Sequence, residues 1–439
     1  MIDKSKAVPK TRLGRLAKIA KLAGGVAGGV LAEGARQWRA GNRLRASDLL
    51  LTPANARRVT RQLSEMRGAA MKLGQILSMD SGDFLPKELA DILAQLRDGA
   101  YAMPDAQLYE MLRDAYGDNW QSKLRNFEST PFAAASIGQV HRLSARDGRD
   151  AVLKIQYPGV AESIDSDVDN LATLLRLSGL LPKHIDIQPL LLDVKLQLRD
   201  EANYVQEARY LNSFIRALGE DERFLLPRVI PSLTSERILA MTFVPGEPIE
   251  SLIDARQVER DRVMSLLIEL LLVELFDLRL VQTDPNFANY RYNAETGQLV
   301  LLDFGASRRF KARFVHAYRD LLAAQLSGDR EAVTDAANRV GYGLGQGDTT
   351  DEAYRDLLLD LFDIVLDPIS CDGPYDFGSS TIPAQTMALS ARLQDHKAAW
   401  QAPPIDAAYI HRKIGGLFML ASRLKARVDV RALLNPYLT

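Results

Sequence analysis

The position of one short strand-rich section between helical stretches constrains the fold of this chain more than any other feature. Residues 127–157 read as strands and contain the short apolar run 151–155. Helical periodicity precedes this section and returns after it, over 55–77, 105–116, 160–218, 256–280 and 311–435. Further strands are expected at 236–244 and on both sides of a turn within 290–303. A small strand-rich section among long helices predicts the α+β class.

Bulk properties narrow the class of protein. The length of 439 residues exceeds one ordinary core, so two lobes or domains are expected. The formal net charge of -1 provides no overall attraction to nucleic acid, and none is predicted as a partner. Cys371 is the only cysteine, which excludes an internal disulfide framework and a cysteine-based metal cluster. No stretch reaches the roughly 20 apolar residues that a membrane-spanning helix needs.

The first 45 residues are strongly basic, because many lysines and arginines face only Asp3 and Glu33. This asymmetry predicts contact with an anionic surface, such as acidic phospholipid. The pairs Gly24-Gly25 and Gly28-Gly29 would let helices approach each other closely. A membrane contact, a homodimer contact and a basic arm packed on the body all stay open at this point.

Two acidic positions in the second half of the chain carry the strongest chemical signal. An apolar strand, 299–302, delivers Asp303 into a turn at Gly305, as in the Mg²⁺-binding Asp-Phe-Gly element of protein kinases. Asn289 lies fourteen residues upstream, and Asp284 lies five residues before it. That spacing matches a kinase catalytic loop, in which the aspartate orients the nucleophile and the asparagine binds a metal. Asp284 is therefore predicted to be catalytic, and Asn289 and Asp303 are predicted to bind Mg²⁺.

The first half of the chain supplies the residues expected to bind the nucleotide. Lys154 lies in the apolar strand and matches the lysine that holds the α- and β-phosphates of ATP. A buried lysine is costly without a partner, and Glu207 on the following helical stretch is the best candidate. A linker between the lobes is expected to bind adenine through its backbone, at Met241, Thr242 and Val244. The order of these motifs along the chain predicts ATP or ADP with Mg²⁺ as cofactors.

Two features depart from ordinary protein kinases. The expected phosphate-binding loop is rich in alanine, which restricts φ and should stiffen it, over Ala133, Ala134, Ala135, Ser136 and Ile137. No Ala-Pro-Glu follows Asp303, and a helix is expected from about Lys311, so little room remains for a peptide-docking platform. A conventional protein kinase is therefore the least favoured hypothesis. A second Asp-Phe-Gly, at 376–378, follows no strand and is interpreted as structural.

These motifs resemble the UbiB family of atypical kinases, the AarF and ADCK group, over about residues 9–438. The family's K-x-G-Q hallmark matches Lys72, Gly74 and Gln75, and the alanine-rich loop is a second hallmark. The segment 282–286 resembles the branch that serves coenzyme Q synthesis. The resemblance implies a bilobal protein-kinase-like fold in which the K-x-G-Q helix gates the active site. The expected domains are a basic segment 1–50, a helical extension 51–125, an N-lobe 126–244 and a largely helical C-lobe 245–439.

Two glutamates are candidate partners for two separate lysines, with two solvated glutamates as the alternative. Glu201 and Glu207 lie six residues apart and would point in different directions on one helix. This suits Glu207 as the partner of Lys154 and Glu201 as the partner of Lys72. Asn203 departs from the family's E-x-D pattern and removes a negative charge near the proposed Lys72 contact.

The resemblance implies slow ATP hydrolysis and a requirement in ubiquinone biosynthesis, with peripheral attachment to the inner membrane. The location would be cytoplasmic, or the matrix side in a mitochondrion. Acidic phospholipids and ubiquinone-biosynthesis enzymes or quinone precursors are the implied partners. The alternative is a non-catalytic, nucleotide-gated scaffold or lipid-handling module. For His411-Arg412-Lys413, an anion site and simple packing stay open as alternatives.

Overall fold

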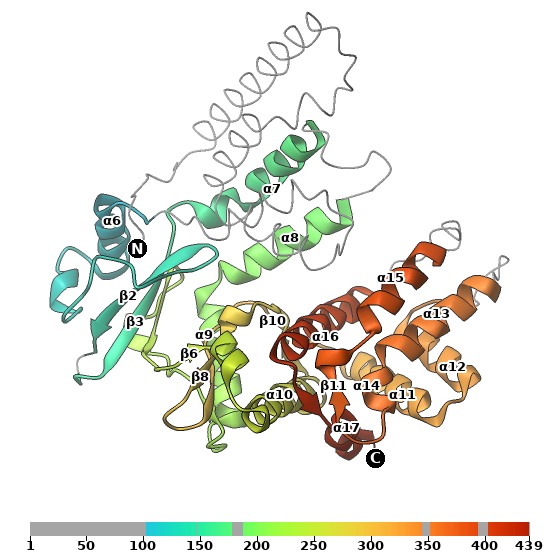
Figure 1. The fold of residues 1–439 in the computed structure, drawn as a ribbon. Helices are drawn as coiled ribbons and strands as arrows, with labels where there is room; N and C mark the ends of the chain where they lie inside the picture. Colours follow the sequence, from blue (N-terminus) through green and yellow to red (C-terminus); the bar gives the residue numbers. More distant parts are fainter. Residues whose placement is uncertain (1–101, 146, 178–187, 345–351, 394–402, 439) are drawn as a thin grey trace, which may run out of the picture. The chain divides into compact units, whose positions relative to one another are not determined.

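The computed structural model describes residues 102–145, 147–177, 188–344, 352–393 and 403–438. The chain divides into two compact units, the first running to Arg216 and including Pro227–Val244, the second comprising Ala217–Leu226 and Pro245–Thr439. Each unit contains a four-stranded sheet together with helices, so the predicted α+β class is confirmed (Figure 1). No helix within the described ranges is both long and apolar enough to cross a membrane. The basic segment and the K-x-G-Q stretch lie outside the described residues.

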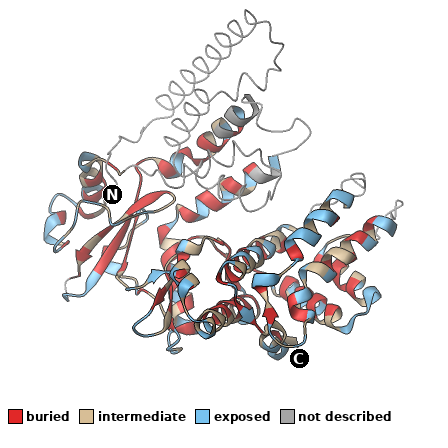
Figure 2. Cartoon of the chain, in the orientation of Figure 1, coloured by how far each residue is buried: buried red, intermediate tan, exposed pale blue. Residues whose placement is uncertain are grey.

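The first unit is built around an antiparallel sheet of order β1-β2-β3-β5. Beyond its first residue, β3 is buried along its whole length, as its apolar sequence predicts (Figure 2). The helices α7 and α8 lie side by side (Figure 1). The elements are α6 (Asp105–Tyr116), η2 (Trp120–Ser122), β1 (Ala133–Ala134), β2 (Gly138–Ser144), β3 (Asp150–Gln156), α7 (Val160–Leu177), α8 (Gln188–Glu201), α9 (Tyr204–Leu218), η3 (Pro231–Leu233) and β5 (Ile238–Thr242).

The chain turns between α8 and α9, which sequence periodicity did not indicate. Asn203 caps α9, because its Oδ1 accepts a 3.0 Å hydrogen bond from the backbone N–H of Gln206. The prediction that Glu201 and Glu207 share one helix is therefore wrong, since Glu201 ends α8 and Glu207 lies in the first turn of α9. Asparagine and aspartate cap helices about equally well, so Asn203 serves this cap as the family's aspartate would.

The second unit contains a sheet of order β4-β9-β8-β6 and two two-stranded ladders, β10-β7 and β11-β12. The predicted helix over 256–280 is α10, which continues into a π-helical turn, η5. The elements up to the last predicted motif are β4 (Phe224–Leu225), β6 (Glu247–Pro248), η4 (Ile249–Asp254), α10 (Gln257–Leu272), η5 (Val273–Asp277), β7 (Leu280–Gln282), η6 (Phe287–Asn289), β8 (Tyr290–Asn293), β9 (Gln298–Leu301) and β10 (Ser307–Arg309).

The remainder of the second unit is largely helical, as expected from residue 311 onward (Figure 1). It consists of α11 (Ala312–Ser327), α12 (Arg330–Val340), α13 (Glu352–Val365), α14 (Asp367–Ser370), β11 (Tyr375–Asp376), η7 (Phe377–Ser379), α15 (Ile382–Leu393), α16 (Ile405–Leu424), β12 (Arg427–Val428) and α17 (Val430–Leu438). Asp376 of the second Asp-Phe-Gly caps η7, because its Oδ1 accepts from the N–H of Gly378 at 2.9 Å. The expectation that no strand precedes this motif is wrong, since Tyr375 and Asp376 form β11.

Candidate functional site

The predicted site residues fall into two sets, one in each compact unit, and the first set centres on Lys154. Its Nζ donates to Glu207 Oε1 at 2.8 Å and to Oε2 at 3.0 Å. The predicted ion pair is therefore present. The lysine side chain is 9% exposed and the glutamate side chain 1% exposed, so the pair is shielded from water. Tyr204, at the start of the same helix, places its ring centroid 5.2 Å from Nζ.

The alanine-rich loop is a tight hairpin between β1 and β2. The N–H of Ala135 donates to the carbonyl of Gly138 at 2.9 Å and closes the turn. Register places Ala133 opposite Val140, and Val140 opposite Lys154, so the loop's first strand and the lysine share one row across the sheet. The row brings the predicted phosphate-binding loop and the phosphate-binding lysine together within one unit.

The last residue of this loop, Ile137, and the first residue of β2, Gly138, serve the fold. Ile137 is only 1% exposed, so its side chain belongs to the core. Gly138 follows it, and a Cβ at this position would lie 2.3 Å from the carbonyl oxygen of Ile155. No larger residue fits there without moving the backbone of β3.

Ser136, at the tip of the loop, makes a contact that sequence reasoning missed. Its hydroxyl donates to Glu201 Oε2 at 2.5 Å, which ties the loop to the end of α8. No spacing rule connects two residues so far apart in the chain. The other partner proposed for Glu201, Lys72, lies outside the described residues together with Gly74 and Gln75.

The predicted adenine-binding linker continues from β5. Met241 pairs with Val152 in the sheet, and the N–H of Thr242 donates to the carbonyl of Arg228 at 2.9 Å. The Thr242 N–H is thus used inside the unit, while Val244 is the last residue of the unit.

An arginine sandwich braces this linker. The guanidinium of Arg142 lies 4.2 Å from the ring centroid of Phe132 and 4.3 Å from that of Phe243. Phe132 immediately precedes the alanine-rich loop, and Phe243 belongs to the linker. The sandwich therefore connects two segments predicted to bind the nucleotide.

The second set lies on two neighbouring connections between paired strands. β7 ends at Gln282, opposite Ser307, and β8 begins at Tyr290, opposite Leu301. The catalytic loop, 283–289, and the Asp-Phe-Gly turn, 302–306, therefore run beside each other. Direct hydrogen bonds join them: both the N–H and the hydroxyl of Thr283 donate to the carbonyl of Ala306, at 3.1 and 2.8 Å. The carbonyl of Asn289 accepts from the N–H of Leu302 at 3.1 Å.

The side chains of these loops have the chemistry of a magnesium site. Asn289 Nδ2 donates to the carbonyl of Asp284 at 3.3 Å, an orientation that directs Oδ1 elsewhere. Asp303 Oδ1 accepts from the N–H of Gly305 at 2.9 Å, which fixes the carboxylate in the turn. Mg²⁺ prefers oxygen ligands and commonly combines one or two protein side chains with phosphates and water. In the described ranges there is no group of three or more His, Cys, Asp or Glu that could hold a metal ion.

The segment His411-Arg412-Lys413 is not an anion site at Lys413. This lysine is 1% exposed, and its Nζ lies 3.5 Å from Glu274 Oε2 inside the unit. Of the two alternatives left open by the sequence, packing is correct for Lys413. His411 is engaged as well, through a 2.8 Å hydrogen bond to the hydroxyl of Tyr342.

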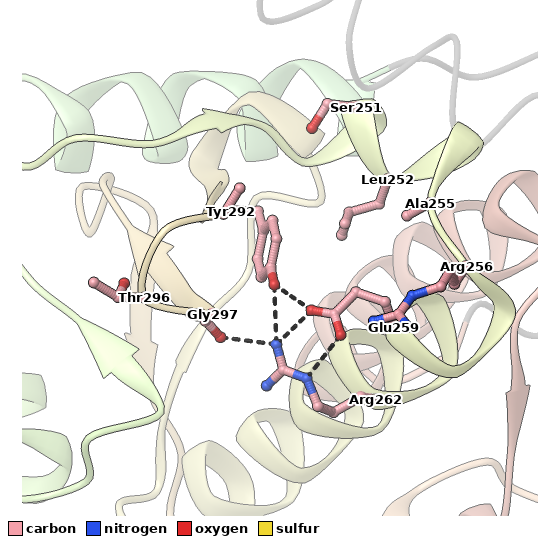
Figure 3. Close-up of a pocket in the computed structure, with 10 residues that line it drawn as sticks. Ser251, Leu252, Ala255, Arg256, Glu259, Arg262, Tyr292, Thr296 and Gly297 are labelled. Carbon is pink, nitrogen blue, oxygen red and sulfur yellow. Dashed lines mark hydrogen bonds and ion pairs between the residues drawn. The ribbon is translucent and has the colours of Figure 1, made fainter.

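The second unit also has a surface hollow of about 620 Å³ that contains none of the predicted site residues (Figure 3). Arg262 at its floor bonds Glu259 at 2.8 Å and the carbonyl of Gly297 at 2.8 Å, and the Tyr292 hydroxyl donates to Glu259. Arg262 holds the pKa of the Glu259 carboxyl below its usual range. These hydrogen bonds join α10, which carries Glu259 and Arg262, to the β8–β9 hairpin, which carries Tyr292 and Gly297.

A strand lysine paired with a helix glutamate, and an Asp-x-x-x-x-Asn loop bonded to an Asp-Phe-Gly turn, together define the protein-kinase-like class. The family model described as "ABC1 atypical kinase-like domain" matches residues 95–337. The chain belongs to this family, and its relatives place it in the coenzyme Q branch of UbiB, as predicted.

Two relatives illustrate the likeness. "Atypical kinase coq-8, mitochondrial" of Caenorhabditis elegans is 36% identical over 98% of this chain, which spans 57% of the worm protein. "Atypical kinase COQ8, mitochondrial" of Saccharomyces cerevisiae is 36% identical over 97% of this chain and 84% of the yeast protein. A Mycobacterium tuberculosis protein solved with erythromycin shares the fold, with a TM-score of 0.60 and 23% identity over 87% of this chain and 95% of that one.

Proposed function

We propose that this protein is an atypical kinase-like ATPase that works with Mg·ATP in ubiquinone biosynthesis. The observation that carries the proposal is the pair of joined loops, which fixes Asp284, Asn289 and Asp303 on two neighbouring connections. The buried Lys154–Glu207 pair supports it, because a strand lysine held in this way is the group that binds the α- and β-phosphates in kinases.

Each residue would have a separate task. Lys154 would bind the phosphates, and Glu207 would hold its ammonium group in place. Asn289 and Asp303 would hold Mg²⁺, which neutralises charge on the β- and γ-phosphates when it is bound. Asp284 would orient the attacking oxygen of water or of a small-molecule hydroxyl and accept its proton. Ala133, Ala134, Ala135 and Ser136 would shape the phosphate pocket, and Met241, Thr242 and Val244 would border the adenine.

The setting of the reaction is part of the same proposal. The worm and yeast relatives are named as mitochondrial proteins, and the basic first 45 residues favour an acidic phospholipid surface. The protein would act there with enzymes or quinone precursors of the pathway, gated by Lys72, Gly74 and Gln75 together with Glu201. Self-association through the paired glycines near the start would give a homodimer.

A matched pair of aspartate variants tests the chemistry. Asp303→Asn removes the predicted metal-binding carboxylate, and we expect kcat for Mg·ATP hydrolysis to fall by about 10²–10³-fold. Asp376→Asn alters the other Asp-Phe-Gly, where asparagine can still cap η7, so its kcat should stay within about twofold of wild type. Equal activity of Asp303→Asn and wild type, or no stabilisation of wild type by Mg·ADP in a thermal-shift assay, would refute the proposal.

Ubiquinone content measured in a deletion strain separates catalysis from scaffolding. We expect the wild-type gene to restore ubiquinone and the Asp284→Asn variant to leave it low. Restoration by Asp284→Asn at normal protein abundance would instead favour the nucleotide-gated scaffold.

A further inference from the structure

One face of α16 contacts the catalytic loop and strand β10, which follows the Asp-Phe-Gly turn. Asp406, Tyr409, Lys413 and Gly416 follow one another at intervals of three or four residues, so they lie along a single helical face. We call these four residues the loop-facing stripe. Each of them contacts a residue of the catalytic loop, a residue that flanks this loop, or Arg308 of β10.

Lys413 connects the two ends of the catalytic loop. Its Nζ donates to Gln282 Oε1 at 3.2 Å and to the hydroxyl of Tyr290 at 2.5 Å. Gln282 is the last residue before loop 283–289, and Tyr290 is the first residue after it. A single ammonium group therefore bonds both residues that flank the loop.

The ammonium group itself is held by Glu274. The carboxylate lies 3.5 Å away in η5, and the two side chains are 1% and 2% exposed. Burying an ion pair brings little net stability, whereas removing one partner costs several kcal/mol. The π-helical turn that carries Glu274 is a rare local structure that often occurs at functional sites. The Lys413–Glu274 pair is therefore better suited to holding the loop in position than to stabilising the fold.

Gly416 lies directly against the catalytic loop. A Cβ at this position would lie 2.3 Å from the Cβ of Pro285, the residue that follows Asp284. A Cβ at the neighbouring Gly415 would have no atom of another segment within 4 Å. The absence of a side chain at 416 therefore lets the helix backbone come directly against the loop.

The start of the stripe holds the strand that follows the Asp-Phe-Gly turn. Arg308 of β10 donates to Asp406 at 3.2 Å, and its guanidinium lies 4.4 Å from the ring centroid of Tyr409. α16 thus contacts both the catalytic loop and β10, the strand after the Asp-Phe-Gly turn. Protein kinases carry His-Arg before the catalytic aspartate, whereas here Gln282 stands at the histidine position and bonds to Lys413.

We propose that the loop-facing stripe of α16 positions the catalytic loop, with Lys413 and Gly416 as positioning residues that determine where Asp284 and Asn289 lie. This inference rests on the proposed function of the loop. The stripe contributes no group to the chemistry; it sets the geometry of the groups that do.

The adjacent glycines provide a matched test. Gly415→Ala and Gly416→Ala both replace a helix glycine by alanine, so the two variants gain helix propensity alike. Gly415→Ala should keep kcat within about twofold of wild type, because the added methyl group enters open space. The methyl group of Gly416→Ala would overlap Pro285, so the loop must move. Because Asp284 precedes Pro285, this movement should lower kcat about 10- to 100-fold. KM for ATP should change less than about threefold, since the nucleotide-binding residues of the first unit are untouched.

Hydrogen exchange gives a readout that does not require ATP hydrolysis. We expect Gly416→Ala to speed exchange of the backbone amides at 286–290 while amides of α11 and α12 keep their wild-type rates. If Gly416→Ala matches Gly415→Ala in both kcat and loop exchange, the inference is wrong. A wild-type protein without ATPase activity would refute the proposed function, and the exchange comparison would still decide whether α16 holds the loop.

A charge-neutral double variant separates positioning from folding. Lys413→Met alone removes the cation that faces the Glu274 carboxyl, so lower stability is expected at high pH, where this carboxyl is charged. Adding Glu274→Gln removes that charge and should restore the stability at high pH, while kcat stays at least about tenfold below wild type. Recovery of wild-type kcat in the folded double variant would overturn the role of Lys413.

Discussion

The two units each contain a buried lysine–glutamate pair, and the pairs differ in what surrounds them. In the first unit, Lys154 and Glu207 lie 2.8 Å apart, and the lysine side chain keeps 9% of its surface exposed. In the second unit, Lys413 and Glu274 lie 3.5 Å apart, and the lysine side chain is 1% exposed. Both ammonium groups also lie 5.2 Å from a tyrosine ring centroid.

The chemical type of a residue pair therefore does not reveal its use. Lys154 projects from β3 in the same row of the sheet as the alanine-rich hairpin, and its ammonium group forms an ion pair with Glu207. Lys413 is enclosed by Gln282, Tyr290 and Glu274, so its donors are spent inside the protein. The first pair suits ligand binding, and the second suits holding a loop in place.

The largest effect that would test this contrast comes from replacing each lysine by arginine. Lys154→Arg keeps the charge but changes the shape of the donor, so we expect kcat/KM for ATP to fall about 10²–10³-fold with little change in Tm. Lys413→Arg must fit a larger group into a closed space and should lose about 1–3 kcal/mol of stability. Enzyme kinetics and thermal unfolding of both variants give the comparison. A Tm loss in Lys154→Arg as large as that in Lys413→Arg would show that both pairs are structural.

The next effect is the pH dependence of stability that Glu274 of the second unit causes. Burial raises the pKa of Glu274 to about 7, although Lys413 opposes the rise. The folded protein therefore holds this proton more tightly than the unfolded chain does. The resulting stability is complete below about pH 4.5 and is lost as the pH rises through about 7, by about 3 kcal/mol at most.

Urea unfolding of wild type and Glu274→Gln between pH 5 and 8 measures this contribution. The difference between their free energies of unfolding should shift against wild type as the pH rises. A difference that moves in favour of wild type would mean that Lys413 outweighs burial and holds the Glu274 pKa low.

The smallest expected effect tests the helix that carries Glu207. Asn203→Asp should change stability and activity little, because both residues cap α9. Asn203→Ala removes the side-chain acceptor and should cost about 1 kcal/mol, measured by chemical denaturation. If Asn203→Asp raised activity severalfold with unchanged stability, the residue would act through its charge near the active site.

Local pattern was sufficient for much of the fold. The helix at 105–116, the strands around 290–303 and the helix after Lys311 follow from periodicity and apolar runs, and the structure contains them. The Lys154–Glu207 pair could be predicted because a lysine in an apolar strand requires a counter-charge. The turn at Ala202–Asn203 escaped prediction because the flanking helices have continuous helical periodicity.

Other contacts had no signal in the sequence. Ser136 and Glu201 are far apart in the chain, and neither residue type demands the other. Lys413 carried a charge that is most often solvated, so its burial against Glu274 and Tyr290 could not be read from its neighbours.

The sequence alone determined the chemical groups available and the order in which the chain presents them, because catalytic residues must be of particular types at particular spacings. Only the tertiary structure decided that Lys154 lies in the sheet beside the alanine-rich hairpin and that Lys413 is enclosed against loop 283–289. That choice depends on how β2, β3 and α9 pack in one unit and how α16 packs against loop 283–289 in the other. Burial and partner geometry arise from contacts between distant segments, and no local pattern encodes them.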